Sequence, residues 1–289
     1  MEGMAKILDQ LKQKIENSKA GSHLSLVECC DGSGLIHTLR WVEDPEYLDK
    51  NGNPIKEQVA KIEYCKCRDE KVFAKNNASA GMKESEREHT FETAQIDSEN
   101  QRHFKTATEF IENIQKHREL GSWLYIFGDE TRARDKGMEA YGTGKTYLMH
   151  CIGNALTKMR IPAIYVTEDK LFQDIKDTYD RESAESESDV LRRYYNVPIL
   201  LIDDLFSAQY KEWAESKLYG ILNTRKGDNK ITIITTNYAP NRIRERLPIN
   251  GAKIASRIME ESILIEMIGK DRRVKEGARK SEKRREWSK

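Results

Sequence analysis

The segment YGTGKT, residues 141–146, has the residue types and spacing of a phosphate-binding loop. Backbone N–H groups at the start of the following helix are expected to surround a β-phosphate. Lys145 would reach the β- and γ-phosphate oxygens, and the Thr146 hydroxyl would ligate Mg²⁺. The sequence therefore predicts an ATP or GTP site formed by Gly142, Thr143, Gly144, Lys145 and Thr146.

The loop departs from the full pattern G-x-x-x-x-G-K-[ST], because position 139 is Glu. The glycine that normally closes the preceding strand is instead Gly128, with thirteen residues between it and Gly142. An ordinary loop has two residues between these glycines. About eleven residues within DETRARDKGMEA are therefore predicted to be an insertion.

A pair of acids ends the apolar run VPILLIDD, residues 197–204. At the carboxyl end of a buried strand, Asp203 would hold the hydration shell of Mg²⁺, and Asp204 would polarise the attacking water. Two acids that only begin a loop would not explain a strand, loop and helix with GKT about 57 residues earlier. Together the two motifs predict nucleotide binding with magnesium.

Two further polar residues follow this pattern. Asn237 comes at the end of the run KITIITTN, where its amide could orient the water beside the γ-phosphate; alternatively, it is a turn residue. Arg257 lies on a short predicted helix, GAKIASRI, from which it could reach the γ-phosphate of a neighbouring subunit as an arginine finger. The alternative for Arg257 is a surface arginine in an ion pair.

Short β-branched runs alternate with helical patterns through the C-terminal two thirds of the chain. The runs are residues 124–128, 161–167, 197–204, 230–237 and 263–268. Because they are nearly free of charge, we expect strands buried on both faces. Their alternation with helices predicts an α/β fold, with a five-stranded parallel sheet and helices on both faces.

The N-terminal third has a different character. Residues 1–20 show one apolar helical stripe, and the strand-like runs GLIHTLRWV and VAKIEYC flank the turn signal KNGNP. Residues 74–88 are small and polar and are predicted to be a linker. We therefore expect a small N-terminal domain over 1–85 and an ATPase domain over 86–289.

With these residues in place, the chain resembles the bacterial replicative-helicase loaders of the AAA+ superfamily, the DnaC/DnaI type, and their transposition relative IstB. The likeness runs from about residue 89 to residue 273. It rests on the order and spacing of TFETAQIDSENQ, GTGKTYL, ILLIDDLF, LYGILNTR, ITIITTNY and ASRI.

The resemblance implies a five-stranded core without a helical lid, binding of ATP and Mg²⁺, and self-assembly through the ATP sites. It also implies a DnaB-type helicase and single-stranded DNA as partners. The shorter side chain of Asp204, where most AAA+ enzymes have Glu, suggests slow, switch-like hydrolysis.

Two low-specificity predictions come from the same resemblance. Some loaders carry an N-terminal zinc module, and here the candidate ligands are Cys29, Cys30, Cys65 and Cys67; small buried thiols are the alternative. Loaders use a helix pair near residues 170–193 against single-stranded DNA, and the candidates there are Phe172, Lys176, Tyr179 and Arg181. Core packing explains Phe172 equally well, and the nearby DRESAESESD is acidic.

Composition narrows the class of protein. The longest apolar run, residues 197–202, is too short to cross a bilayer, and the N-terminus lacks an apolar signal region. A cytoplasmic protein with free or metal-bound thiols is expected. The net charge of the whole chain is +1, but residues 269–289 carry ten Lys/Arg and four Asp/Glu. This basic segment is either a solvated tail or a contact to nucleic-acid phosphates.

Three functions fit these features. The first is an ATP-dependent loader that delivers a ring helicase onto single-stranded DNA at replication start. The second is a transposition helper that assembles on duplex DNA, and the third is a binding protein whose interrupted loop no longer turns over ATP. A cysteine module favours the loader, and the divergent N-terminus and the insertion favour a phage origin.

Overall fold

The computed structural model describes residues 73, 76–180 and 184–273 with their side chains, and the backbone of residues 35–48 and 54–64. These last two segments pair as an antiparallel hairpin of β1 (Leu35–Leu48) and β2 (Pro54–Tyr64), which confirms the strands expected around the turn signal. The helical stripe expected in residues 1–20 lies outside the described residues. None of the described helices combines the length and the apolar character needed to cross a membrane.

Five parallel strands form one sheet in the order β4-β5-β6-β3-β7. They are β3 (Trp123–Phe127), β4 (Ala163–Thr167), β5 (Ile199–Leu205), β6 (Ile231–Thr236) and β7 (Ser262–Glu266). This sheet confirms the predicted fold class. Because the strands are parallel, their carboxyl ends share one edge, and the residues that follow β3, β5 and β6 are brought together there.

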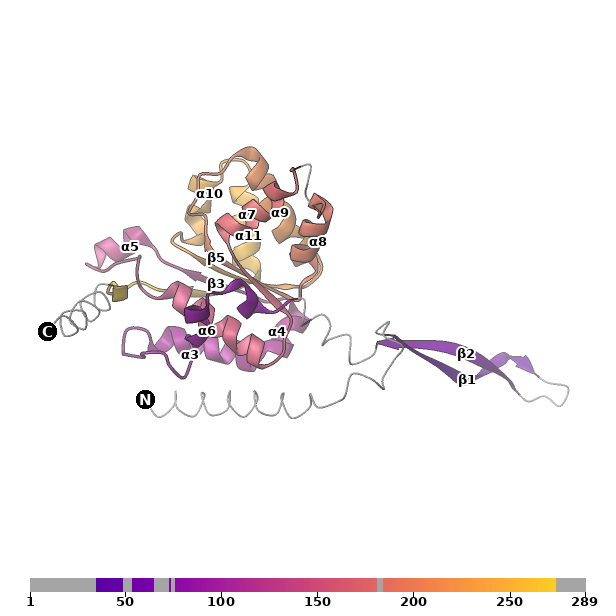
Figure 1. Cartoon of the computed structure of the whole chain (residues 1–289). Helices are drawn as coiled ribbons and strands as arrows, with labels where there is room; N and C mark the ends of the chain where they lie inside the picture. Colours follow the sequence, from indigo (N-terminus) through magenta and orange to yellow (C-terminus); the bar gives the residue numbers. More distant parts are fainter. Residues whose placement is uncertain (1–34, 49–53, 65–72, 74–75, 181–183, 274–289) are drawn as a thin grey trace.

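Helices cover both faces of the sheet (Figure 1). On one face lie α3 (Gln101–Glu112), α4 (Ile114–Leu120) and α6 (Lys145–Lys158); on the other lie α7 (Glu168–Asp177), α8 (Glu187–Asn196), α9 (Glu212–Gly227), α10 (Ile243–Arg246) and α11 (Gly251–Glu261). Side chains of β3 alternate between the two cores: Leu124 and Ile126 enter the first, and Trp123 and Tyr125 enter the second. Within the described residues, no helical lid follows β7.

The linker interpretation of residues 74–88 is wrong for residues 76–88. These residues form two short 3₁₀ helices, Ala78–Gly81 and Glu84–Glu88, that pack on α6 and β4. Ala78 and Met82 are buried in the first core, and Asn154 of α6 donates hydrogen bonds to the carbonyls of Glu86 and His89. Two buried apolar side chains and the hydrogen bonds from Asn154 attach this polar stretch to the ATPase core.

Candidate nucleotide site

The chain leaves the sheet at Gly128 and returns beside it at Ala140. A Cβ on Gly128 would lie 2.6 Å from the Ala140 carbonyl oxygen and 3.2 Å from Nζ of Lys145, so the contact requires glycine. The residues between form α5 (Glu130–Asp135) and a turn. Gly128 therefore stands where the first glycine of a phosphate-binding loop belongs, and residues 129–139 form an excursion from that loop.

Gly142 and Gly144 give the loop its shape. Their φ values of 66° and 100° lie in the left-handed region that favours glycine. Gly144 immediately precedes α6, so the free N–H groups of the first helical turn open into the loop. Lys145 is only 8% exposed, and its Nζ donates to the Ala140 carbonyl at 2.6 Å. The loop is thus an anion-binding cradle with a cation inside it.

The charge of Lys145 depends on its surroundings. Burial lowers the pKa of the ammonium group to about 8, while the nearby Asp204 and Asp203 carboxylates oppose that shift. A phosphate anion in the loop would also favour the charged form. The lysine therefore suits a ligand that brings negative charge into the loop.

Asp203 is held at the end of β5 by three hydroxyl groups. Its Oδ1 accepts hydrogen bonds from Thr146, at 3.2 Å, and from Thr235, and its Oδ2 accepts one from Tyr165 at 3.0 Å. The carboxylate is 4% exposed. A threonine hydroxyl next to an oriented carboxylate is a donor set that suits Mg²⁺. The structure therefore brings together Thr146 and Asp203, the two predicted magnesium ligands.

Asp204 and Asn237 lie side by side at the mouth of the site. Asn237 follows β6 and its Nδ2 donates to Asp204 Oδ1 at 3.3 Å. Asp204 has a φ of 56°, unusual for a residue with a side chain, and its N–H donates to Thr235 Oγ1 at 2.9 Å. Burial beside Asp203 raises the pKa of the Asp204 carboxyl. This geometry suits the orientation of a water molecule, the role predicted for both residues.

A chain of buried hydrogen bonds extends from Asp203 to the segment before α3. The Tyr165 hydroxyl that donates to Asp203 lies 3.1 Å from Nε2 of His150, and Nδ1 of His150 lies 3.0 Å from Nδ1 of His89. Burial lowers the pKa of His150. The sequence does not predict this series of hydrogen bonds, because its side chains come from separate elements, namely α6, β4 and the segment that contains residue 89.

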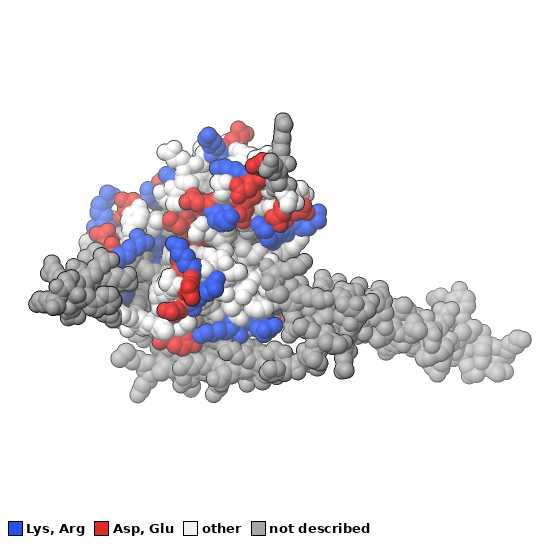
Figure 2. Space-filling view, in the orientation of Figure 1, with Lys and Arg blue, Asp and Glu red and all other residues white. Residues whose placement is uncertain are grey.

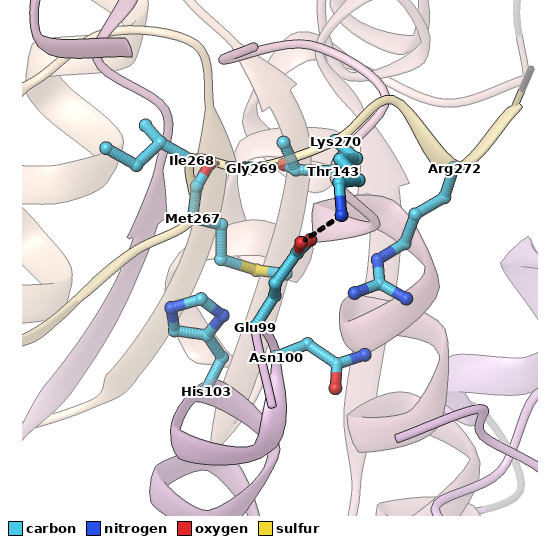
Figure 3. Close-up of a pocket in the computed structure, with 9 residues that line it drawn as sticks. All are labelled: Glu99, Asn100, His103, Thr143, Met267, Ile268, Gly269, Lys270 and Arg272. Atoms are coloured by element: carbon cyan, nitrogen blue, oxygen red, sulfur yellow. Dashed lines mark hydrogen bonds and ion pairs between the residues drawn. The ribbon is translucent and has the colours of Figure 1, made fainter. Parts of the chain in front are cut away.

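A small hollow of about 10 Å³, with room for about one water molecule, adjoins the loop on the side of Thr143 (Figure 3). Its walls are the start of α3 and the segment that follows β7, residues 267–272. Two ion pairs bridge these walls, Glu99 with Lys270 at 2.9 Å and Asp97 with Arg272 at 2.9 Å. Sequence reasoning missed this hollow, because its two walls are about 170 residues apart in the chain. The segment TFETAQIDSENQ forms part of one wall. In the sequence it is recognised only as a motif of the family that the chain resembles.

The family model of the bacterial DnaA ATPase domain matches residues 85–257, more than half of the chain. The chain belongs to this family. The chromosomal replication initiator protein DnaA of Oenococcus oeni is 31% identical over 121 residues, which cover 41% of this chain and 25% of the relative. DnaA of Buchnera aphidicola is 27% identical over 158 residues, covering 54% and 31%. The chain thus spans between a quarter and a third of the length of these relatives.

Solved structures show the same fold. The DnaC helicase loader matches with a TM-score of 0.53 and 23% identity, covering 64% of this chain and 99% of that one. DnaI matches with a TM-score of 0.51 and 23% identity, covering 66% and 94%. The resemblance to AAA+ proteins of the DnaC/DnaI type is therefore confirmed at the level of the fold, and the family match identifies an AAA+ ATPase domain.

Arg257, the predicted arginine finger of this AAA+ domain, lies on α11 and contacts α9. Its guanidinium donates to Asn223 Oδ1 and to the Tyr219 hydroxyl, at 2.6 and 2.9 Å, and stacks over the Tyr219 ring. Among the described residues it has no carboxylate partner, so the ion-pair alternative has no support. The side chain is positioned by neutral groups, which leaves its charge uncompensated.

Three of the predicted DNA contacts lie around Trp213 of α9, but they differ in exposure. Phe172 is buried against Tyr210 and Trp213, so the prediction that it stacks on a base is wrong. Lys176 and Tyr179 are exposed beside Trp213. Acidic and basic side chains alternate around α7 and α8 on the face shown in Figure 2. Arg181 lies outside the described residues.

The predicted zinc ligands Cys29, Cys30, Cys65 and Cys67 also lie outside the described residues. Within the part of the chain that is described, no cluster of His, Cys, Asp and Glu could hold a metal ion. Cys151 of α6 is a buried free thiol whose pKa is raised by burial. It packs in the first core and plays no part in the nucleotide site.

Proposed function

We propose that the protein is a slow, switch-like ATPase that delivers a DnaB-type replicative ring helicase onto single-stranded DNA. The observation that carries the proposal is the assembled site, in which the phosphate-binding loop, the Thr146–Asp203 pair and the Asp204–Asn237 pair meet at one edge of the sheet. A binding protein that had lost turnover would not need the last pair. The eleven-residue excursion leaves the loop intact, which removes the reason for considering the site inactive.

The residues divide the chemistry of ATP hydrolysis among them. The N–H groups of the loop and Lys145 would bind the β- and γ-phosphates, and Mg²⁺ held by Thr146 and Asp203 would neutralise charge on their oxygens. Asp204 and Asn237 would orient the attacking water. The Asp204 side chain is one methylene shorter than Glu and is already engaged by Asn237, and both features favour slow hydrolysis.

The structural match to the DnaC helicase loader, which covers 99% of that chain, supports a loader. The sequence matches to DnaA cover 25% and 31% of those relatives. In the proposal, the part of the chain before residue 76 docks on the helicase, and residues 76–289 form the ATPase domain. The proposed domain boundary at residue 76 replaces the one predicted at residue 85, because residues 76–88 pack on the ATPase core.

The DNA contacts are proposed for the exposed Lys176 and Tyr179, which lie beside Trp213. An aromatic ring next to a cation can stack on a base while the cation meets a phosphate. ATP would tighten DNA binding by the same factor by which DNA tightens ATP binding, because the two are thermodynamically linked.

Helicase loading onto protein-coated single-stranded DNA circles tests the proposal directly. The full chain with ATP should stimulate unwinding by a DnaB-type helicase, and Lys145→Ala should not. Fluorescence anisotropy with a labelled oligonucleotide should show tighter binding with a non-hydrolysable ATP analogue, and weaker binding as salt rises. Absence of both stimulation and nucleotide-dependent DNA binding would refute the proposal.

The alternative is a transposition helper of the IstB type, which shares the ATPase core but assembles on duplex DNA. The same anisotropy measurement separates the two functions. A strong preference for duplex over single-stranded oligonucleotides, with no effect on helicase loading, would favour the helper.

A further inference from the structure

Three side chains, His89, His150 and Tyr165, lead from the predicted magnesium ligand Asp203 to the segment before α3. We call them the histidine series. The Tyr165 hydroxyl donates to Asp203 Oδ2 at 3.0 Å, and its oxygen lies 3.1 Å from Nε2 of His150. On the other side of that ring, Nδ1 lies 3.0 Å from Nδ1 of His89. The chemistry proposed above uses neither histidine, so the series needs a role of its own.

The hydrogen bond to Asp203 decides how the inner part of the series is directed. A phenol has a single hydrogen, and Tyr165 gives it to the carboxylate. The Tyr165 oxygen can then only accept from His150, so Nε2 of His150 must carry a proton. The Glu86 carboxylate, 3.9 Å from that nitrogen, favours the same arrangement.

His89 completes the arrangement from the other side of the ring. His150 is 3% exposed and burial lowers its pKa, so its ring is neutral and Nδ1 is an acceptor. The contact between the two Nδ1 atoms needs a donor, which is then Nδ1–H of His89. His89 is itself held in place, because its ring lies 4.4 Å from the Tyr147 ring and its carbonyl accepts from Asn154 at 2.8 Å. Every hydrogen bond of the series therefore points toward Asp203.

The reverse arrangement would release Asp203. With the proton of His150 on Nδ1, its Nε2 would become an acceptor, and the Tyr165 hydroxyl could turn to it and leave Asp203 Oδ2 without that donor. A proton on Nδ1 of His89 opposes this arrangement, because two donors would then face each other. Polarisation along the series also strengthens the hydrogen bond to the carboxylate.

We propose that His150 is a positioning residue for the magnesium site, and that His89 fixes its tautomer so that the Tyr165 hydroxyl stays on Asp203. The inference rests on the proposed function, in which Asp203 holds Mg²⁺. Both histidines act through a neighbour rather than on the nucleotide. The contribution of His150 should therefore be that of about one hydrogen bond, an approximately 2- to 10-fold effect on Mg²⁺ affinity.

The first test measures how Mg²⁺ tightens binding of a fluorescent ATP analogue to the full chain. His150→Leu should raise the Mg²⁺ concentration that gives half of this effect by about 2- to 10-fold. His150→Gln, whose side-chain amide can donate to Tyr165, should stay near the natural value. Affinity without Mg²⁺ should be alike in all of them. Cys151→Ala, which alters packing on the same helix outside the series, is the control.

A double-variant cycle separates positioning from support of the fold. In a Tyr165→Phe chain, His150→Leu should have no further effect on the Mg²⁺ dependence, because its influence passes through the hydroxyl that is already absent. Equal effects of His150→Leu with and without that hydroxyl would make the histidine a packing residue and would overturn the proposal.

Nitrogen-15 NMR of the histidine-labelled chain tests the proton positions without nucleotide or metal. The chain has six histidines, so single substitutions can assign the ring signals. We expect a proton on Nε2 alone in His150 and a proton on Nδ1 of His89. His89→Leu should shift His150 toward a mixture of its two tautomers. A proton on Nδ1 of His150 in the natural chain would overturn the arrangement, and an unchanged His150 signal in His89→Leu would overturn the role of His89.

The outcomes keep this inference apart from the proposed function. Binding that depends on Mg²⁺ in the natural chain and is unchanged in folded His150→Leu would overturn the positioning role and leave the nucleotide site intact. Failure of the natural chain to bind the analogue would overturn the proposed site, and the role of the series with it. If His150→Leu does not fold, the NMR spectrum of the natural chain still decides whether the arrangement exists.

Discussion

The phosphate end of the candidate nucleotide site and the hollow beside Thr143 are built in different ways. At the phosphate end, Lys145 and Asp203 are buried, and the carboxylate is held by hydroxyl groups from three separate elements. At the hollow, residues 97–103 and 267–272 face each other and are joined by ion pairs that are partly exposed. Exposed ion pairs add little stability, so these walls can part at small cost.

This difference suggests a division of tasks. A rigid, preorganised phosphate end supports chemistry, because catalytic groups must be held close to their working geometry. The walls of the hollow are joined by partly exposed charges and contribute less to that geometry. Variants of the phosphate end should therefore have larger effects than variants of the hollow.

Arg257→Ala tests whether the phosphate end is complete within one chain. We expect ATP binding to persist and hydrolysis to fall by roughly 10³- to 10⁵-fold, the range for a strong arginine finger. Turnover under saturating ATP measures this, with Arg244→Ala, an exposed arginine on α10, as the control.

Mixing Arg257→Ala with Lys145→Ala provides a second readout. Each variant supplies the half-site that the other lacks, so partial hydrolysis should return. Normal turnover by Arg257→Ala alone, together with no effect of mixing, would show that the site is complete within a single chain.

Lys145→Ala should weaken ATP binding by about 100-fold or more, because charge-assisted hydrogen bonds to two phosphates are lost. Lys158→Ala, at the other end of α6 and paired with Glu92 on the surface, is the matched control and should bind normally. Titration with a fluorescent ATP analogue labelled on the ribose measures both. Unchanged affinity of Lys145→Ala would place the nucleotide elsewhere.

The contrast between the phosphate end and the hollow also explains what could be predicted from the sequence. Lys145, Thr146 and the Asp203–Asp204 pair belong to short motifs at the ends of apolar strands, where local pattern and topology agree. The hollow brings together residues 97–103 and 267–272, and only the folded sheet makes them neighbours.

The region of the predicted DNA contacts shows how far a local pattern reaches. Helix α8 is the second member of the helix pair that the resemblance implies near residues 170–193, but its own pattern is weak, because it follows an acidic stretch and has only three buried residues. Of the two alternatives for Phe172, the structure shows core packing, and its helical spacing with Leu171 and Ile175 is that of a buried face.

Tyr165→Phe sharpens the account of the phosphate end. Removing one hydroxyl should free Asp203 Oδ2 and weaken the apparent affinity for Mg²⁺ by about 10- to 100-fold, the usual effect of losing a group that orients a metal ligand. The measurement is nucleotide affinity as a function of Mg²⁺ concentration. Tyr195→Phe, on the half-exposed end of α8, should leave that dependence unchanged. Equal Mg²⁺ dependence in Tyr165→Phe and the natural chain would show that the threonines alone hold Asp203.

Deleting residues 129–139 makes the smallest change to the phosphate end and a larger one to the hollow. The deletion joins Gly128 to Ala140, which are already in contact, and restores the spacing G-x-x-G-x-G-K-T. It removes α5 and the two backbone hydrogen bonds, 2.7 and 2.9 Å long, between Glu139 and Gly269. Loss of two such bonds should lower the free energy of unfolding by about 1–3 kcal/mol.

Because Glu139 holds the segment after β7 through Gly269, its loss should be felt at the hollow before it is felt at Lys145. ATP affinity should therefore stay within about threefold of the natural chain, since the loop itself is unaltered, while thermal stability falls. Thermal unfolding and titration with a fluorescent ATP analogue measure the two effects. A deletion variant that no longer unfolds cooperatively would make the excursion part of the core. One that folds but loses ATP binding would show that the phosphate end depends on the segment after β7, and the two could no longer be treated as independent.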